Sequence, residues 1–243
     1  MSNSMTIADV FYVLDFDRCL GNTQRLSEAL EDIIESETAI SRAQLQRARY
    51  EAEARGDAFD TSRYVRARLA DLDDTHSWQS LLQQFIKTAQ TQNMLEPYAH
   101  ALLAILDAKR IPYGILTFGS EAWQLAKLEA SNMIEVPHLV THLETKGILL
   151  SGWRKGENEF IIPPALTRDF QPLIVKSIVF LDDKVMSFYD MPPEVQGVHI
   201  TGVGTPLKSQ GGDLPAGVVS VQGLYGAIEY LFPKELDTII DKT

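Results

Sequence analysis

The chain has 243 residues, of which 22 are basic and 33 are acidic, so its formal net charge is −11. This surplus of acid argues against general binding to nucleic acid, because such binding depends on Lys and Arg neutralising phosphates. No stretch reaches the roughly 20 apolar residues of a membrane helix, and the N-terminus lacks the pattern of a signal peptide. The single cysteine, Cys19, excludes an internal disulfide. Together these features predict a soluble cytoplasmic protein without a nucleic-acid or membrane partner.

Short apolar runs rich in β-forming residues recur along the chain, and the strongest of them stop at a polar residue. They cover residues 10–14, 113–116 and 177–181, and the polar residues that follow are Asp15, Thr117 and Asp182. Such runs are typical of strands that are buried on both faces, as in a parallel sheet covered by helices. Weaker strand patterns lie at residues 136–140 and 198–201, and helical patterns at residues 98–109, 121–131 and 224–232. The alternation predicts an α/β fold with a Rossmann-like, doubly wound and mostly parallel sheet.

Residues 24–93 break this alternation, because they contain no convincing strand. Apolar residues recur there at the spacing of an amphipathic helix in two places, one with Leu26, Leu30 and Ile34 and the other with Trp78, Leu81 and Phe85. We therefore predict a helical insertion of residues 24–93 into a core formed by residues 1–23 and 94–243. Residues 148–162 contain two apolar runs around a polar stretch and predict a β-hairpin, and residues 202–217 predict a long loop.

The strongest polar signals lie where the predicted strands end. The residues are Asp15, Asp17, Thr117, Asp182 and Asp183. Because parallel strands bring their carboxyl ends to one edge of the sheet, we expect these side chains to meet in one crevice. Asp15 and Asp17 project to the same side of an extended chain, so one can attack phosphorus while the other protonates the leaving oxygen. Crowded carboxylates repel one another, and Mg²⁺ suits an all-oxygen site of this kind.

Three motifs carry a resemblance to the haloacid dehalogenase-like superfamily. They are DFDRCLGNT at residues 15–23, ILTFG at residues 115–119 and VFLDDK at residues 179–184. In that superfamily two aspartates, one residue apart, follow the first strand, a Thr or Ser ends the next strand, and an acidic pair follows a later one. The order and the separations match, and the resemblance covers the whole chain. The helical insertion falls where many members carry an α-helical cap.

The resemblance implies a Mg²⁺-dependent phosphatase that hydrolyses a small phosphorylated metabolite through an aspartyl-phosphate. Asp15 would be the nucleophile and Asp17 the general acid and base. The magnesium ligands would be the Asp15 carboxylate, the Asp17 carbonyl and Asp182, with Asp183 in support. The phosphoryl group would be bound by Thr117, Phe118 and Gly119. The presence of Asp17 favours phosphate chemistry, since members that remove halide generally lack this second aspartate.

The superfamily's third motif is a lysine that neutralises the nucleophile and the phosphate, and the sequence leaves its identity open. Lys146 is the first choice, because it follows the third predicted strand after a short loop. Lys155 and Lys184 remain alternatives through loop geometry. Lys176 begins the fourth predicted strand and would therefore lie at the wrong edge of the sheet.

Two other functions are compatible with parts of this pattern. A binding or regulatory protein could keep the fold without turnover, which the unsettled third motif favours and the intact aspartates oppose. A phosphoryl-receiving signalling domain also combines an acidic pair with Asp, Thr and Lys, but in another order along a shorter chain. The sequence specifies neither the phosphate ester nor the oligomeric state.

Overall fold

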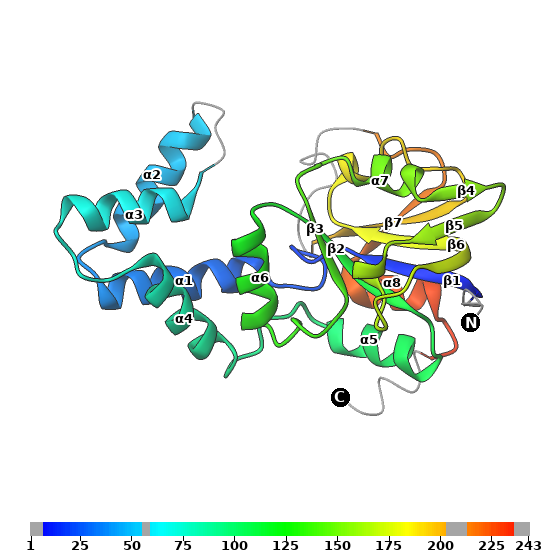
Figure 1. The fold of residues 1–243 in the computed structure, drawn as a ribbon, viewed down its shortest axis with the longest axis horizontal. Coiled ribbons are helices and arrows are strands. Elements are labelled where there is room, and N and C mark those ends of the chain that lie inside the picture. Colours follow the sequence, from blue (N-terminus) through cyan, green and yellow to red (C-terminus); the bar gives the residue numbers. More distant parts are fainter. Residues whose placement is uncertain (1–6, 55–58, 203–212, 236–243) are drawn as a thin grey trace. The chain divides into compact units, whose positions relative to one another are not determined.

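A computed structural model describes residues 7–54, 59–202 and 213–235 (Figure 1). The chain divides into two compact units. The first, called the sheet unit below, consists of Met1–Asn22, Leu95–Leu125 and Met133–Thr243. The second, called the helical unit, consists of Thr23–Met94 and Ala126–Asn132. No helix among the described ranges is long and apolar enough to cross a membrane.

The helical unit is built from amphipathic helices. They are α1 (Thr23–Glu37), α2 (Arg42–Ala54), α3 (Thr61–Asp71) and α4 (Trp78–Ala89). Their apolar sides pack together, with Leu26, Leu30 and Ile34 of α1 and Leu81 and Phe85 of α4 buried. The helical pattern expected from the sequence is therefore present, whereas the assignment of residues 24–93 as a cap stays a prediction.

The described part of the sheet unit contains eight strands. They are β1 (Ile7–Leu14), β2 (Tyr113–Phe118), β3 (His138–Thr141), β4 (Arg154–Gly156), β5 (Glu159–Ile162), β6 (Leu173–Asp182), β7 (Val195–Thr201) and β8 (Val218–Gln222). Strands β3, β2, β1, β6, β7 and β8 lie side by side in this order, and each neighbouring pair is parallel. The outer edge of β6 is shared, because its first residues pair antiparallel with β5 and its later residues pair with β7. This arrangement confirms the predicted Rossmann-like, mostly parallel sheet.

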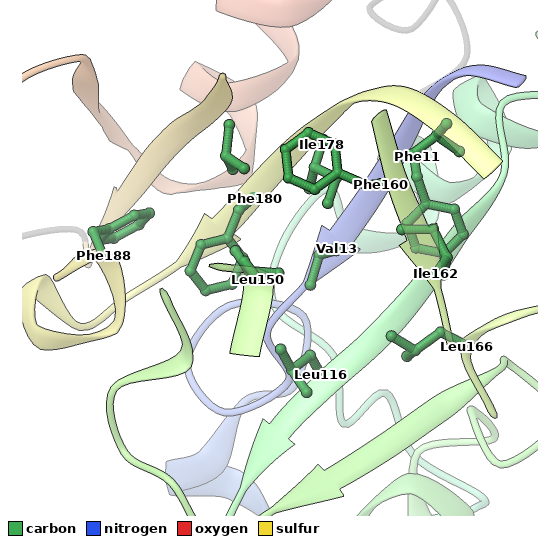
Figure 2. Packing of buried hydrophobic residues seen from close by; sticks show 12 residues of the cluster. Phe11, Val13, Leu116, Leu150, Phe160, Ile162, Leu166, Ile178, Phe180 and Phe188 are labelled. Carbon is green, nitrogen blue, oxygen red and sulfur yellow. The ribbon is translucent and has the colours of Figure 1, made fainter. Parts of the chain in front are cut away.

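One face of the sheet carries a large apolar core (Figure 2). Alternate residues of a strand point to opposite faces, so Phe11 and Val13 of β1 lie on the same side as Ile178 and Phe180 of β6. The residues that cover them come from helix α7 (Lys146–Gly152), the β4–β5 hairpin and two short 3-10 helices, η1 (Pro164–Leu166) and η2 (Val185–Phe188). They are Leu150, Phe160, Ile162, Leu166 and Phe188. This packing fixes α7 against the middle of the sheet.

The opposite face is covered by α5 (Ala99–Ala108) and α8 (Gly223–Leu231), which pack against each other. Tyr12, which alternates with Phe11 and Val13, stacks there on Phe232 at a ring-centroid distance of 5.7 Å. A further helix, α6 (Glu121–Ala130), follows β2, and the boundary between the two units falls within it.

Two segments differ from the sequence-based expectation. Only Arg154–Gly156 and Glu159–Ile162 form the hairpin predicted for residues 148–162, because Lys146–Gly152 forms helix α7. A short apolar run is equally compatible with a buried strand and a buried helix. Here the run forms a helix, in which Leu150 packs into the apolar core. The loop predicted for residues 202–217 lies mostly outside the described residues, and strand β8, which follows it, was not predicted.

Candidate active site

The order of the strands reverses between β1 and β6, since β2 and β3 lie on one side and β7 and β8 on the other. Ligands of open α/β sheets bind at the carboxyl ends of the strands at such a point. Leu14 of β1 pairs in register with Leu181 of β6, and the Asp15 N–H donates to the Leu181 carbonyl oxygen at 2.9 Å. The ladder therefore brings Asp15 and Asp182 side by side at this edge.

Lys146 joins these two aspartates from helix α7. Leu150 is four positions after Lys146, so both lie on the side of α7 that faces the sheet. Leu150 packs into the apolar core, and Lys146 Nζ donates to Asp15 Oδ1 and, at 2.7 Å, to Asp182 Oδ2. The Lys146 side chain is only 3% exposed. Burial acts against its charged form, but the two carboxylates outweigh burial and raise the pKa of Lys146, which therefore stays protonated.

A buried acidic cluster surrounds this lysine. Carboxylate oxygens of Asp15, Asp182 and Asp183 lie within 4.8 Å of one another. Burial raises the pKa of Asp15 well above its usual range, with Lys146 opposing this shift and the neighbouring aspartates adding to it. Burial and the Asp182 charge raise the pKa of Asp183 to about 7. One ammonium against three carboxylates leaves uncompensated negative charge, so the donor set fits a divalent cation that prefers oxygen ligands, such as Mg²⁺.

The other predicted site residues lie on the loop after β1 and at the end of β2. Asp17 is half-buried, and its Oδ2 accepts a hydrogen bond from Gln124 Nε2 at 3.0 Å. Thr117 is fully buried, and its hydroxyl has no hydrogen-bond partner within the described part of the chain. The Phe118 carbonyl oxygen accepts from Gln124, and the Gly119 N–H donates to the Thr141 carbonyl at 3.0 Å. Among the described residues the Thr117 hydroxyl is thus a donor with no partner, whereas these two backbone groups already have one.

The three other lysines considered from the sequence do not contact Asp15. Lys155 lies 4.0 Å from Glu159 in the hairpin. Lys176 pairs with Asp9 at 2.7 Å near the start of β1, at the other end of the sheet. Lys184 lies over the Phe118 ring, with Nζ 5.2 Å from the ring centroid. Among these candidates the structure places only Lys146 within the acidic cluster.

Two residues that the sequence did not indicate support the site from outside the motifs. Gln124 of α6 contacts Asp17, and the buried His199 of β7 places Nε2 3.1 Å from the Asp183 carbonyl oxygen. Neither residue follows a strand directly, so the polar residues at strand ends do not indicate them. Gln124 lies seven residues after Thr117, on the helix that follows β2. A projection of that helix could have indicated it as a polar residue near the first motif.

The second residue of helix α7, Gly147, is a glycine that the packing of the helix requires. A Cβ atom on Gly147 would overlap the Tyr189 carbonyl oxygen and lie 2.8 Å from the Met191 backbone nitrogen. Backbone atoms cannot turn aside, so we expect Gly147→Ala to displace the first turn of α7 and to lower the free energy of unfolding by about 1–3 kcal/mol. Gly152→Ala, in the same helix but with nothing within 4 Å of the added Cβ, is the matched control. Equal stability of the two variants in urea unfolding would contradict this packing.

The fold is that of the haloacid dehalogenase-like hydrolases. A protein described as a haloacid dehalogenase-like hydrolase from Burkholderia xenovorans LB400 is 19% identical, with a TM-score of 0.58 over 94% of this chain and 98% of that one. The HAD-hydrolase YfnB from Bacillus subtilis, solved bound to magnesium, is 13% identical, with a TM-score of 0.52 over 93% of this chain and 100% of that one. Scans against protein-family models and against curated proteins found no match. The likeness to solved structures confirms, at the level of the fold, the resemblance that the motifs indicated.

Proposed function

We propose that this chain is a Mg²⁺-dependent hydrolase of small phosphomonoesters, in which Asp15 accepts the phosphoryl group. The observation that carries the proposal is the buried cluster of Asp15, Lys146, Asp182 and Asp183 at the point where the strand order reverses. Apolar residues of similar volume would often stabilise a fold at least as well as buried charges do. The presence of four buried ionisable groups at a ligand-binding edge therefore supports a role in chemistry.

The proposed reaction has two steps, both at phosphorus. First, an Asp15 carboxylate oxygen attacks phosphorus and the bond to the ester oxygen breaks, while Asp17 gives its proton to that oxygen. Second, Asp17 takes a proton from water, the water oxygen attacks phosphorus, and the bond to Asp15 breaks. The products are the alcohol and inorganic phosphate, and both aspartates return to their starting states.

The remaining groups of the site bind the phosphoryl group and the metal and neutralise negative charge. The Lys146 ammonium holds the Asp15 carboxylate in place. The Thr117 hydroxyl, which has no partner in the described ranges of the chain, is suited to donate to a phosphoryl oxygen. Magnesium would be held by the Asp15 carboxylate, the Asp17 carbonyl and Asp182, with Asp183 in support. When bound, it would neutralise negative charge on the phosphoryl group. We also propose that residues 24–93 serve as the cap that selects the substrate.

Phosphate release from an aryl phosphate, measured with Mg²⁺ and after its removal by a chelator, tests this function. Turnover that requires Mg²⁺ is the expected result. Turnover that persists after chelation would contradict the proposed metal dependence. Absence of turnover on the aryl ester and on a panel of metabolite phosphates would overturn the proposed activity.

Magnesium affinity is expected to depend on pH near neutrality. Because the pKa of Asp183 is raised to about 7, a proton competes with the cation below this pH and leaves the carboxylate above it. The affinity should therefore increase as the pH rises from about 6 to about 8, with release of about one proton per ion at the lower end. Calorimetric titration of the protein with Mg²⁺ at several pH values measures this. An affinity that stays constant across the range, or the same pH dependence in Asp183→Asn, would contradict it.

A further inference from the structure

The side chain of Gln124 contacts both of the first two motifs, at Asp17 and at Phe118. No step of the proposed reaction uses it. It lies on α6 and is 3% exposed. Its side-chain amide donates to Asp17 Oδ2 at 3.0 Å and to the Phe118 carbonyl oxygen at 2.6 Å. The amide thus connects the proposed general acid to the backbone at the end of β2.

Chemistry fixes which end of the amide faces these groups. Asp17 Oδ2 and the Phe118 carbonyl oxygen are both acceptors, so only the nitrogen, with its two N–H groups, can satisfy them. The opposite orientation would place Oε1 against two oxygens. Each N–H therefore has one partner, and the pair of contacts defines the direction from which Asp17 is held.

The surroundings of the amide indicate that its position serves its two N–H groups and not its carbonyl oxygen. Gln124 Oε1 is buried and has no hydrogen-bond partner among the residues that the structure describes. A buried acceptor without a partner is unfavourable for folding. In addition, residue 119 is a glycine at φ 143°, and a Cβ there would lie 2.7 Å from Gln124 Nε2. The missing side chain at Gly119 thus leaves room for the Gln124 amide nitrogen.

We infer that Gln124 is a positioning residue that orients the Asp17 carboxylate for proton transfer to the leaving oxygen. Since Oδ2 faces an N–H donor, the transferable proton belongs on the other oxygen, Oδ1. In the first step that proton moves from Oδ1 to the ester oxygen as its bond to phosphorus breaks. This inference rests on the proposed function, and it concerns only the step that needs an acid.

The test uses esters that differ in their need for an acid. An alkyl phosphate requires protonation of its leaving oxygen, whereas an aryl phosphate with an acidic phenol leaves readily without it. Gln124→Met keeps the length and removes both donors, and Gln124→Ala is a second variant that cannot crowd the site. We expect kcat for the alkyl ester to fall roughly 10²-fold in both variants, and kcat for the aryl ester to fall only slightly. KM for both esters should change little, because Gln124 is not proposed to touch the substrate.

Gln196→Met is the matched control, since this exposed glutamine of β7 donates to Tyr230 and lies outside the site. Equal losses on both esters in folded Gln124 variants would overturn the positioning role and indicate a structural one. The absence of any loss would also overturn the positioning role. In both cases wild-type turnover of the two esters leaves the proposed function intact. Wild-type protein that hydrolyses neither ester would overturn the proposed function and this inference together.

Discussion

Replacement of Asp15 by Asn is expected to lower turnover by a factor on the order of 10³ or more, because an amide cannot form the acyl-phosphate. The loss should not come from unfolding. Burial raises the pKa of Asp15 well above its usual range, which means that the folded state disfavours its charged form at neutral pH. A neutral side chain of the same shape removes that penalty, so the melting temperature should stay the same or rise.

Asp9→Asn is the matched control for this prediction. Asp9 lies on the same strand as Asp15, but it is exposed and pairs with Lys176 at 2.7 Å. Its replacement should leave phosphate release unchanged. Turnover of Asp15→Asn close to that of the wild type would rule out Asp15 as the nucleophile, and a large drop in its melting temperature would contradict the account of the buried charge.

Lys146→Met is expected to affect both stability and turnover. The variant keeps the volume of the side chain but leaves Asp15, Asp182 and Asp183 buried without their ammonium partner. Breaking a buried ion pair on one side typically costs about 3–5 kcal/mol, and we expect a loss of this order in the free energy of unfolding. Turnover should fall at least about 10²-fold, since a preorganised charge next to the reacting group is lost.

Magnesium provides a second measurement on the same variant. An ion that binds only the folded state stabilises it, and the uncompensated carboxylates of Lys146→Met should bind the cation more tightly than those of the wild type. The rise in melting temperature on addition of Mg²⁺ should therefore be larger in the variant. Lys155→Met, which removes an exposed lysine of the hairpin, should behave like the wild type. An equal rise in melting temperature in Lys146→Met and in the wild type would contradict the idea that Lys146 and the metal neutralise the same carboxylates.

The fold and the strand-end residues were predictable from the sequence because both depend on local patterns. Largely apolar runs that stop at Asp15, Thr117 and Asp182 indicate buried parallel strands, and parallel strands bring their ends to one edge. The identity of the lysine was not decided in this way, because it depends on the path of a loop. Packing of Leu150 into the core, four residues beyond Lys146, settles where that side chain lies.

Other parts of the site have no local signature. Gln124 meets Asp17 across 107 residues of sequence, and a neutral glutamine on a helix is ordinary in composition. The segment after Lys146 was assigned as one arm of a hairpin, because three apolar residues in a row fit a strand or a helix equally well. In both cases tertiary contacts, rather than the pattern of neighbouring residues, determine the outcome.

Transfer of the phosphoryl group to Asp15 is the central claim, and trapping that intermediate tests it most directly. Asp17→Asn lacks the base proposed for the second step, so an aryl phosphate that leaves without acid help should phosphorylate this variant and leave the phosphoryl group bound. Acid quenching followed by peptide mass spectrometry locates the group. The expected result is one phosphoryl group on Asp15, which should be absent when Asp15→Asn is added to the variant. A phosphoryl group on any other residue, or labelling that survives Asp15→Asn, would contradict it.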